Sequence, residues 1–279
     1  MNKYETAARL DIVYAVHDGV ELLADLYHPR GMTAAPVLVA VHGGGWQIGD
    51  RKVYQYWGPY LAARGYALFS IEYRLMKPGV NTWPGAAHDV RAAVQYVRAN
   101  AAELGLDPER IALIGDSAGA HLSAMVALAG DETLLAEATG RGVSCQVKAC
   151  IGFYGVYDMI AQWEHDQIYR PRDQITEKFL GGSPAASRRV FFDASPLSYA
   201  TIDKNSTKFL LIYGREDEIV DAATQSDRFL IALKQAGFFA RNIVIPAAGH
   251  FWAADPIEEP GSFGAQIAPR LLRFLEASL

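Results

Sequence analysis

A serine, a histidine and an acidic residue occur in this sequence in an order that suits nucleophilic catalysis. Ser117 lies in Gly115-Asp-Ser-Ala-Gly119, after an apolar segment that predicts a strand and before one that predicts a helix. A sharp turn between a strand and a helix holds a serine in strained backbone geometry and exposes its hydroxyl group, and glycines on either side relieve the crowding. We therefore interpret Ser117 as a nucleophile. The alternative is an incidental serine in a tight turn.

His250 is the histidine that we expect to act as the base. A serine hydroxyl is a weak nucleophile until a neighbouring base takes its proton, and after this type of turn the acid and then the histidine follow in the chain. Only His121, His165 and His250 follow Ser117. His121 lies one helical turn after the serine, where its side chain is badly placed, and His165 precedes every late strand that could supply the acid. His250 follows a predicted strand and the loop at residues 246–249.

Asp217 is the expected acid, because it follows the end of a predicted strand between Ser117 and His250. Residues 208–213 predict that strand, and Gly214-Arg-Glu-Asp217 forms the loop after it. A carboxylate there would orient the imidazole and stabilise its cation. Which carboxylate turns inward is not decided by the sequence. Four others remain candidates: Glu216, Glu218, Asp221 and Asp158.

A run of glycines after the first buried strand predicts an oxyanion-binding loop. The apolar residues 36–42 are followed by Gly43-Gly-Gly-Trp46. Consecutive glycines let backbone N–H groups approach a substrate closely, and such donors stabilise the negative oxygen that forms during acyl transfer. The N–H group after the nucleophile, that of Ala118, is the usual second contributor. No Gly-Lys-Ser/Thr and no Gly-x-Gly-x-x-Gly accompanies the run, which disfavours a phosphate-binding loop.

The elements that must position these residues alternate between strand and helix. Two alternating segments, residues 10–16 and 20–27, flank Asp18-Gly19 and predict a hairpin. The order predicts one α/β domain over residues 1–279, with a mostly parallel central sheet and helices on both faces. The predicted strands are residues 36–42, 66–73, 110–115, 147–154, 208–213 and 242–245. The predicted helices are residues 54–64, 86–104, 118–129, 222–236 and 265–277, and residues 157–200 are irregular with short helical pieces.

Composition excludes several classes of function. The 26 lysines and arginines are outnumbered by 31 acidic residues, which disfavours a nucleic-acid partner. No apolar run is long enough to span a membrane, and the N-terminal residues lack a signal peptide, so we expect a cytoplasmic protein. Cys145 and Cys150 match no zinc or redox motif and suit buried apolar positions. We expect no metal and no other cofactor, a small-molecule substrate as the partner, and leave the oligomeric state open.

These motifs together resemble the α/β-hydrolase superfamily, in particular its hormone-sensitive-lipase-like carboxylesterase branch. They occur in the order His42-Gly-Gly-Gly-Trp46, Gly115-Asp-Ser-Ala-Gly119, Gly214-x-x-Asp217 and Gly249-His250. The resemblance runs from about residue 18 to the C-terminus and implies an α/β-hydrolase fold. Two further motifs are similar to those of small bacterial esterases of the feruloyl- or acetyl-esterase type: Phe179-Leu-Gly-Gly-Ser-Pro184 and Ala194-Ser-Pro196.

The resemblance also implies an activity and refines the oxyanion loop. It implies hydrolysis of small or aromatic carboxylic esters through an acyl-enzyme intermediate, by a triad of Ser117, Asp217 and His250. The N–H donors that it implies are those of Gly44, Gly45 and Ala118, in preference to Gly43.

Two departures from the family pattern bear on the substrate. Only 41 residues precede His42, too few for the large N-terminal cap of longer members, so we expect a small cap at residues 157–200 instead. Gly119 is followed by Ala120-His121, and Ser-Ala-Gly-Ala-His is similar to arylformamidases. That similarity keeps hydrolysis of an amide or N-formyl bond as an alternative. A catalytically silent binding protein of the same fold is the third interpretation.

Aromatic residues around the expected site are candidates for substrate binding, although each could equally serve in ordinary packing. They come from the glycine loop, the loop at residues 76–84, the cap and the segment after the base: Trp46, Trp83, Trp163, Tyr169 and Phe251. Three polar residues could order the loops of the site: His42, Arg74 and Asp116.

Overall fold

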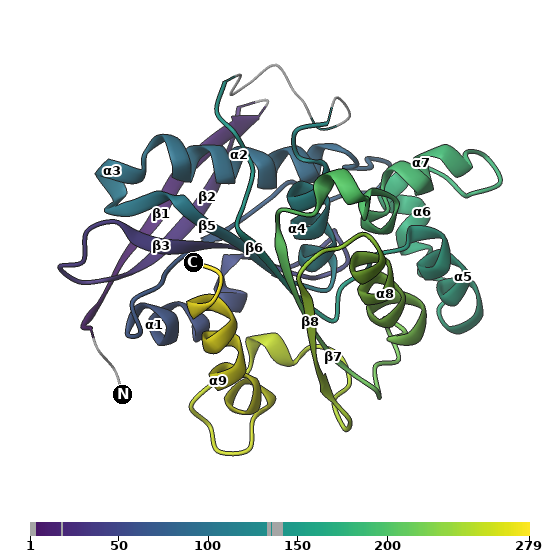
Figure 1. The fold of residues 1–279 in the computed structure, drawn as a ribbon. Coiled ribbons are helices and arrows are strands. Elements are labelled where there is room, and N and C mark those ends of the chain that lie inside the picture. The colour runs from purple at the N-terminus through teal and green to yellow at the C-terminus, as the bar shows by residue number, and fades with distance from the viewer. Residues whose placement is uncertain (1–3, 18, 133–134, 136–141) are drawn as a thin grey trace.

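One eight-stranded sheet organises the structure, a computed structural model that describes residues 4–17, 19–132, 135 and 142–279 (Figure 1). The strand order is β1-β2-β4-β3-β5-β6-β7-β8. β2 pairs antiparallel with β1 and with β4, and every later pair is parallel. The strands are β1 (Thr6–His17), β2 (Val20–Pro29), β3 (Ala35–Val41), β4 (Ala67–Ile71), β5 (Leu106–Asp116), β6 (Ala149–Phe153), β7 (Lys208–Gly214) and β8 (Ala240–Ile245).

Helices cover both faces of the sheet. Figure 1 shows α1 and α9 on one side of the strands and α2, α4 and α8 on the other. The predicted fold class, a mostly parallel sheet between two helical layers, is therefore confirmed. The helices are α1 (Trp57–Ala62), α2 (Gly85–Ala99), α3 (Ala101–Leu104), α4 (Ala118–Ala129), α5 (Met159–Tyr169), α6 (Ile175–Leu180), α7 (Arg188–Asp193), α8 (Arg228–Gln235) and α9 (Phe263–Glu276). Within the described ranges, every helix is too short or too polar to span a bilayer.

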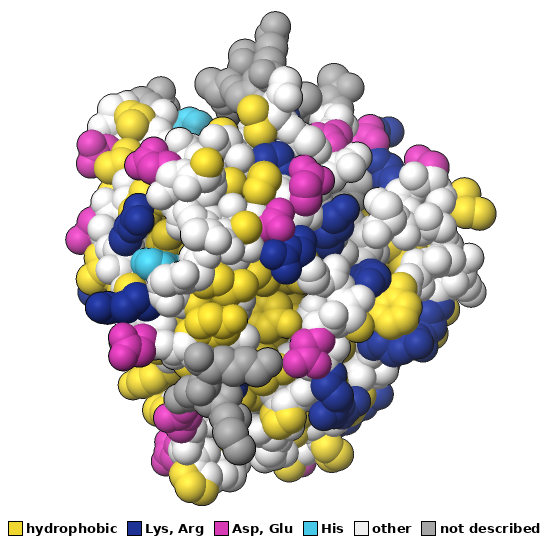
Figure 2. All heavy atoms as spheres, turned by 60° about the vertical axis from the view of Figure 1, so that its left-hand side comes forward, with side chains coloured by type: hydrophobic (Ala, Val, Ile, Leu, Met, Phe, Trp, Pro, Cys, Tyr) yellow, Lys and Arg dark blue, Asp and Glu magenta, His cyan; other side chains and the backbone are white. Residues whose placement is uncertain are grey.

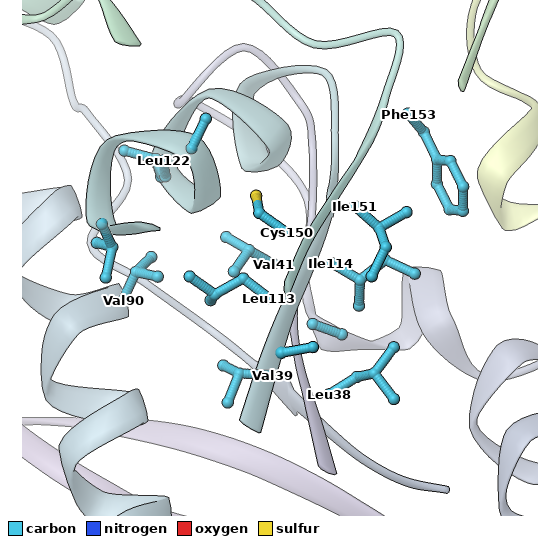
Figure 3. Packing of buried hydrophobic residues seen from close by; sticks show 14 of the residues in the cluster. Leu38, Val39, Val41, Val90, Leu113, Ile114, Leu122, Cys150, Ile151 and Phe153 are labelled. Carbon is cyan, nitrogen blue, oxygen red and sulfur yellow. The ribbon is translucent and has the colours of Figure 1, made fainter. Parts of the chain in front are cut away.

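The core lies on both sides of the central strands. Side chains alternate across a sheet, and Figure 3 shows this for three neighbouring strands. Val39, Leu113 and Cys150 point toward α2 and α4, where Val90 and Leu122 meet them (Figure 3). The next residue of each strand points to the opposite face: Ala40, Ile114 and Ile151 are all fully buried there. Both cysteines are free and buried, as expected from their sequence context.

The first two strands form the predicted hairpin at one edge of the sheet. His17 pairs with Val20, and Asp18 in the expected turn lies outside the described residues. Several hydrophobic side chains of this hairpin are exposed: Leu10, Val13, Val16 and Val20. Figure 2 brings this side of the molecule forward and shows hydrophobic side chains among charges of both signs.

Three predicted helices begin or divide differently in the structure. The segment at residues 86–104 forms two helices, because Asn100 leaves the helical conformation and its side chain donates to the Tyr96 carbonyl. The segment at residues 54–64 starts with the 3-10 turn η1 (Arg51–Tyr54) before α1. The segment at residues 222–236 starts with the π-helical turn η4 (Ala223–Asp227).

The π-helical turn has a structural reason in the side chain of Gln225. This buried amide accepts from the N–H groups of Tyr157 and Asp158, at 2.7 and 2.9 Å, and donates to the Asp158 carbonyl. It thereby satisfies the backbone just after β6. Propensity of the local sequence could not reveal this contact, because it joins segments 67 residues apart or more.

The segment at residues 157–200 is more helical than expected. It contains α5, α6, α7 and the 3-10 turn η2 (Pro196–Tyr199), which lie between β6 and β7 in the chain. Asp158 starts α5 as its N-cap, since its Oδ1 accepts from the N–H groups of Ile160 and Ala161. Figure 1 shows α5, α6 and α7 grouped together at one end of the sheet.

The turn between β5 and α4 depends on two glycines. Ser117 has φ 50° and ψ −117°, a positive φ that is rare for a residue with a side chain. A Cβ atom at Gly115 would overlap the backbone of Gly119, and a Cβ atom at Gly119 would overlap the carbonyl oxygens of Val41 and His42. α4 can therefore approach the end of β3 only without a side chain at position 119.

We predict that Gly119→Ala disrupts this turn. The added methyl group meets the backbone of Val41 and His42 and has no flexible side chain to displace, so we expect a loss of about 3 kcal/mol in the free energy of unfolding. Urea denaturation measures it. Gly182→Ala is the matched control, because the nearest atom to its Cβ would be 3.9 Å away. Equal unfolding midpoints for the two variants would contradict the prediction.

Candidate active site

The structure brings Ser117, His250 and Asp217 together at the carboxyl ends of their strands. Ser117 follows β5, Asp217 follows β7 and His250 follows β8. The Ser117 Oγ lies 3.0 Å from the His250 Nε2, and the His250 Nδ1 lies 2.7 Å from the Asp217 Oδ2. A carboxylate only accepts hydrogen bonds, so Nδ1 carries the proton and Nε2 is free to accept from the serine hydroxyl.

Asp217 is the carboxylate that turns inward from its acidic loop. Its Oδ1 accepts from the N–H groups of Ile219 and Val220, both at 2.9 Å, which leaves Oδ2 for the histidine. The side chains of Asp217 and His250 are almost completely buried. The other candidates are engaged elsewhere or exposed: Asp158 caps α5, Asp221 bonds Thr224, and Glu216 and Glu218 lie at the surface.

Two aromatic rings hold the His250 imidazole. Tyr154 lies with its centroid 4.4 Å from that of His250, and its hydroxyl accepts from the N–H group of Ala253. Phe251 meets the imidazole edge-on at 4.6 Å and is 69% exposed. The role of Tyr154 was not anticipated from the sequence, although its place directly after β6 is a signal, because that strand ends beside the nucleophile.

The glycine loop presents two free N–H groups beside Ser117. Gly44 and Gly45 have φ angles of 107° and 58°. A Cβ atom at Gly44 would overlap the Ile48 carbonyl oxygen. Among the described residues, the N–H groups of Gly44, Gly45 and Ala118 have no hydrogen-bond acceptor. All three residues line one cavity together with Ser117 and His250.

Gly43 was expected among the oxyanion donors, and the structure removes it from that set. Its N–H group donates to the Asp116 Oδ1 at 3.0 Å, so it is not available to a substrate. A Cβ atom at Gly43 would also overlap the Asp116 carboxylate. Gly43 therefore joins the glycine loop to the nucleophile turn.

Asp116 is buried at this junction and ties three segments together. Its Oδ1 also accepts from the Tyr54 hydroxyl at 3.1 Å. Burial raises the pKa of Asp116 to about 6, against the opposing effect of these hydrogen bonds. Tyr73 supports the same region, because its hydroxyl donates to the His42 carbonyl and its ring stacks on His42.

His121 joins α4 to the segment at residues 157–200. Its Nε2 lies 2.7 Å from the Ala194 carbonyl oxygen, so Nε2–H donates there, and its Nδ1 accepts from the Trp46 indole N–H. Burial lowers the pKa of His121 to about 4, which keeps the ring neutral. The partners of both ring nitrogens are thus Trp46 and Ala194, and neither nitrogen is bonded to Ser117, Asp217 or His250.

The cavity over Ser117 has a volume of about 110 Å³. Of the expected aromatic residues, only Trp46 and Phe251 line it. Its remaining wall was not anticipated and comes largely from the segment at residues 157–200 and the acid loop: Gln47, Ile48, Val156, Gln162, Arg170, Ile175, Ile219 and Val220. Aliphatic side chains carry no motif, so the sequence offered no signal for most of them.

Three expected aromatic residues lie outside this cavity. Trp83 packs against Phe179 and His121, with ring centroids 5.9 and 6.1 Å away. The Trp163 indole donates to the Glu177 carboxylate at 2.6 Å. Tyr169 is 68% exposed and lines a second, larger cavity that shares Arg170 and Ile219 with the first. Trp83 and Trp163 are therefore engaged within the protein, and Tyr169 is exposed outside the cavity over Ser117, which corrects the expectation that these three residues line it.

The last polar candidate, Arg74, serves the fold rather than the cavity. Its guanidinium bonds the buried carboxylate of Asp89 and the Gly85 carbonyl, and so fixes the start of α2. His42 holds the glycine loop, because its Nδ1–H donates to the Gly43 carbonyl at 2.7 Å.

A family model described as BD-FAE matches residues 24–233 of the chain. Two relatives from Mycobacterium tuberculosis are similar over most of the chain. Esterase LipQ is 34% identical over 226 residues, which cover 78% of this chain and 51% of that protein. Esterase LipC is 32% identical over 239 residues, which cover 82% and 56%. The chain thus spans about half the length of these curated relatives.

Solved esterase structures share the fold over nearly the whole chain. The apo form of Thermogutta terrifontis esterase 2 has a TM-score of 0.79 at 26% sequence identity, and the match covers 97% of this chain and 94% of that one. The same esterase phosphonylated by sarin also has a TM-score of 0.79 at 26% identity, with 96% and 94% covered.

We predict that Asp116 makes stability depend on pH between about 4 and 6. The folded protein keeps a proton on this carboxyl up to about pH 6, whereas an unfolded carboxyl releases it near its ordinary value of 3.8. The stabilisation is therefore complete below that value and lost as the pH rises through about 6. Asp116→Asn removes the titration and keeps an oxygen acceptor. Relative to wild type, its free energy of unfolding should rise by up to about 3 kcal/mol between pH 4 and pH 7.

Urea unfolding at both pH values measures this difference. Glu258→Gln, which alters an exposed carboxylate, controls for the loss of one charge. If wild type and Asp116→Asn change in parallel with pH, the carboxyl does not titrate as its burial implies.

Proposed function

The chain belongs to the BD-FAE family of the α/β-hydrolase superfamily, and from that premise we propose that it is a serine carboxylesterase that cleaves small esters. The observation that carries the proposal is the unbroken hydrogen-bonded chain from Asp217 through His250 to Ser117. It stands next to three unpaired N–H groups in the described structure, those of Gly44, Gly45 and Ala118. A binding protein without catalysis would have no need of this combination.

The proposed reaction is a double displacement. The Ser117 Oγ attacks the ester carbonyl carbon while the His250 Nε2 takes its proton. The tetrahedral intermediate collapses, the alcohol leaves with that proton, and the acyl group stays on Ser117. Water then attacks the acyl-enzyme, with His250 again as the base, and releases the carboxylic acid. Asp217 holds the imidazole in the required tautomer and stabilises its cation.

The oxyanion hole in this proposal consists of the N–H groups of Gly44, Gly45 and Ala118. Each such donor contributes roughly 3 to 4 kcal/mol to stabilisation of the transition state. Their positions depend on the buried contact between Gly43 and Asp116, because that hydrogen bond holds the glycine loop against the turn that carries Ser117.

An ester is favoured over an amide by what surrounds His121. The sequence Ser-Ala-Gly-Ala-His is similar to that of arylformamidases, but both ring nitrogens of His121 are already hydrogen-bonded, to the Ala194 carbonyl and the Trp46 indole. His121 supports packing between α4 and the segment at residues 157–200. Because it does not line the cavity over Ser117, it offers no amide-specific contact to a substrate.

We further propose that residues 157–200 act as a small cap on a single domain. Gln162, Arg170 and Ile175 from this segment line the cavity with Ser117, which supports the cap. The small cavity suits a short acyl or alcohol group. A preference for aromatic esters would rest on Trp46 and Phe251, the two expected aromatic residues that line the cavity. The cytoplasmic location stays a prediction.

We predict that Ser117→Ala abolishes hydrolysis of 4-nitrophenyl butyrate, with kcat/KM lowered roughly 10⁵-fold or more. Asp217→Asn should lower kcat roughly 10⁴-fold, because the imidazole loses its orienting acceptor. Release of 4-nitrophenol measures both. Ser123→Ala is the matched control, since this serine is buried in the same helix and its Oγ has no partner within the described residues.

Labelling by a fluorophosphonate checks the same assignment without a substrate. The likeness to an esterase that sarin phosphonylates suggests this probe. Mass spectrometry should find the adduct on Ser117 in wild type and Ser123→Ala, and on no residue of Ser117→Ala. A protein that is neither labelled nor active on any ester would rule out the proposed function.

We predict that an ester is cleaved with a higher kcat/KM than its matched amide. 4-Nitrophenyl butyrate and 4-nitrobutyranilide share an acyl group and differ in the group that leaves, a phenol or an aniline. An N-formyl anilide keeps the aniline and replaces the butyryl group by a formyl group. His121 does not line the cavity and therefore offers none of these compounds a contact. Turnover of the three compounds by one preparation measures the preference. Faster cleavage of the N-formyl compound would favour the formamidase alternative.

A further inference from the structure

The end of β6 is bonded to the two neighbouring strands from which the nucleophile and the acid of the proposed triad extend. The Phe153 carbonyl accepts from the Ser117 N–H group at 2.9 Å. The Tyr154 N–H group donates to the Ile212 carbonyl of β7 at 2.7 Å, and Asp217 follows that strand. The backbone of two consecutive residues thus fixes the end of β6 between the nucleophile and the acid.

The Tyr154 side chain reaches from this position to the base. Its ring centroid lies 4.4 Å from that of the His250 imidazole, and its hydroxyl accepts from the Ala253 N–H group at 3.0 Å. The Ala253 carbonyl in turn accepts from the Trp57 indole, also at 3.0 Å. Both backbone groups of Ala253 are therefore held, and the residues that follow His250 are fixed from outside their own loop.

The backbone around this imidazole is strained. Among the described residues, seven other than glycine have a positive φ, and three of them contact His250: Ser117 at 50°, Tyr154 at 37° and Phe251 at 69°. A positive φ is uncommon for a residue with a side chain. It persists only where the surrounding structure determines the conformation several times over, and such positions concentrate at functional sites. The position of the Tyr154 ring is therefore imposed by its surroundings.

Tyr154 can influence the proposed reaction only through its neighbours. It is 2% exposed and does not line the cavity over Ser117. Burial raises the pKa of its hydroxyl well above the usual range, so the group keeps its proton at neutral pH. Tyr154 therefore neither touches a substrate in that cavity nor exchanges a proton with one. Its contact with the reacting groups is the one that it makes with His250.

We propose that Tyr154 is a positioning residue that holds the His250 imidazole in line with the Ser117 Oγ, through its ring and through the hydrogen bond of its hydroxyl with Ala253. The proposal rests on the esterase function proposed above. Asp217 bonds the imidazole at one atom, Nδ1. A hydrogen bond at one atom does not fix the plane of a ring, whereas a second ring packed against it does. Misplacement of a reacting group by about 1 Å can cost roughly 100-fold in rate.

Substitution of Tyr154 tests the proposal through kcat. Tyr154→Phe keeps the ring and loses the hydroxyl, and we expect kcat for 4-nitrophenyl butyrate to fall at least about fivefold. Tyr154→Leu loses both contacts and should lower kcat roughly 100-fold. KM should stay within about threefold in both variants, because the side chain touches no substrate. Titration of Ser117 with a fluorophosphonate gives the concentration of assembled sites, so that kcat refers to folded enzyme only.

Tyr14 provides the matched control. It is a buried tyrosine of β1, at the edge of the sheet, whose hydroxyl donates to the Glu72 carbonyl and whose ring packs edge-on against Phe69. Tyr14→Phe and Tyr14→Leu remove the same kinds of contact from the fold. They should lower the free energy of unfolding, measured with urea, but leave kcat within about twofold of the wild-type value.

The leaving group separates positioning of the base from a general loss of structure. His250 must return its proton to the ethoxide of ethyl butyrate, whereas 4-nitrophenolate leaves without a proton. A misplaced imidazole should therefore lower kcat/KM for ethyl butyrate at least about threefold more than kcat/KM for 4-nitrophenyl butyrate, in Tyr154→Phe and in Tyr154→Leu. Acid release at constant pH measures both esters.

The outcomes distinguish this proposal from the esterase function. Wild-type kcat in Tyr154→Phe would overturn the role of the hydroxyl, and equal kcat in Tyr154→Phe and Tyr154→Leu would overturn that of the ring. An equal fall on both esters would mean that Tyr154 supports the fold only. Tyr154→Met, with a more adaptable side chain, takes the place of Tyr154→Leu if that variant does not fold. A wild-type protein that cleaves neither ester would instead count against the esterase function.

Discussion

The structure depends on the contact between α4 and the end of β3, which only a glycine at position 119 allows. β3 and β5 are neighbours in the sheet, with Val41 opposite Gly115. Their two loops therefore leave the sheet side by side, one with the glycine run and the other with Ser117. A Cβ atom at position 119 would overlap the backbone at the end of β3. Because glycine lacks this atom, α4 lies close enough to β3 for the Gly43 N–H group to reach the Asp116 carboxylate. The relative positions of Ser117 and the N–H groups of the glycine loop follow from this approach.

Buried polar groups secure the arrangement at some cost in stability. Asp116 is held in an apolar environment that raises its pKa to about 6, and His121 in one that lowers its pKa to about 4. Each side chain joins two segments that are distant in sequence, the glycine loop with the nucleophile turn and α4 with the segment at residues 157–200. Apolar packing of similar volume would stabilise these junctions without the directional bonds. Hydrogen bonds are directional, which suits loops whose exact positions determine the reaction.

The proposed catalytic residues and the rest of the cavity wall come from different parts of the fold. The residues of the proposed triad and oxyanion hole lie on loops at the carboxyl ends of parallel strands, which are rigid supports. Another part of the cavity wall comes from α5 and the loop after β7, where Gln162 is bonded to the Ile219 carbonyl. Asp217 lies in that same loop and holds His250. The segment at residues 157–200 is thereby connected to the loop that carries Asp217.

Local sequence determined the elements and the candidate triad, whereas tertiary contacts decided the neighbours of these residues. The periodicity of apolar residues and the residues that form turns are local properties of the sequence. The hairpin, the alternation of strands and helices and the turn at Ser117 could therefore be predicted. Asn100 and Gln225 altered two predicted helices through side-chain hydrogen bonds to the backbone. Asn100 donates to the nearby Tyr96 carbonyl, whereas Gln225 accepts from the distant Tyr157 N–H group. Gly43 could not be told from Gly44 by residue type, because only the distance to Asp116 separates their roles. Trp83 and Trp163 lie outside the cavity, whereas Gln162 lines it. Which side chains face Ser117 depends on how α5 and α6 are placed in the folded protein. No short stretch of sequence encodes this placement.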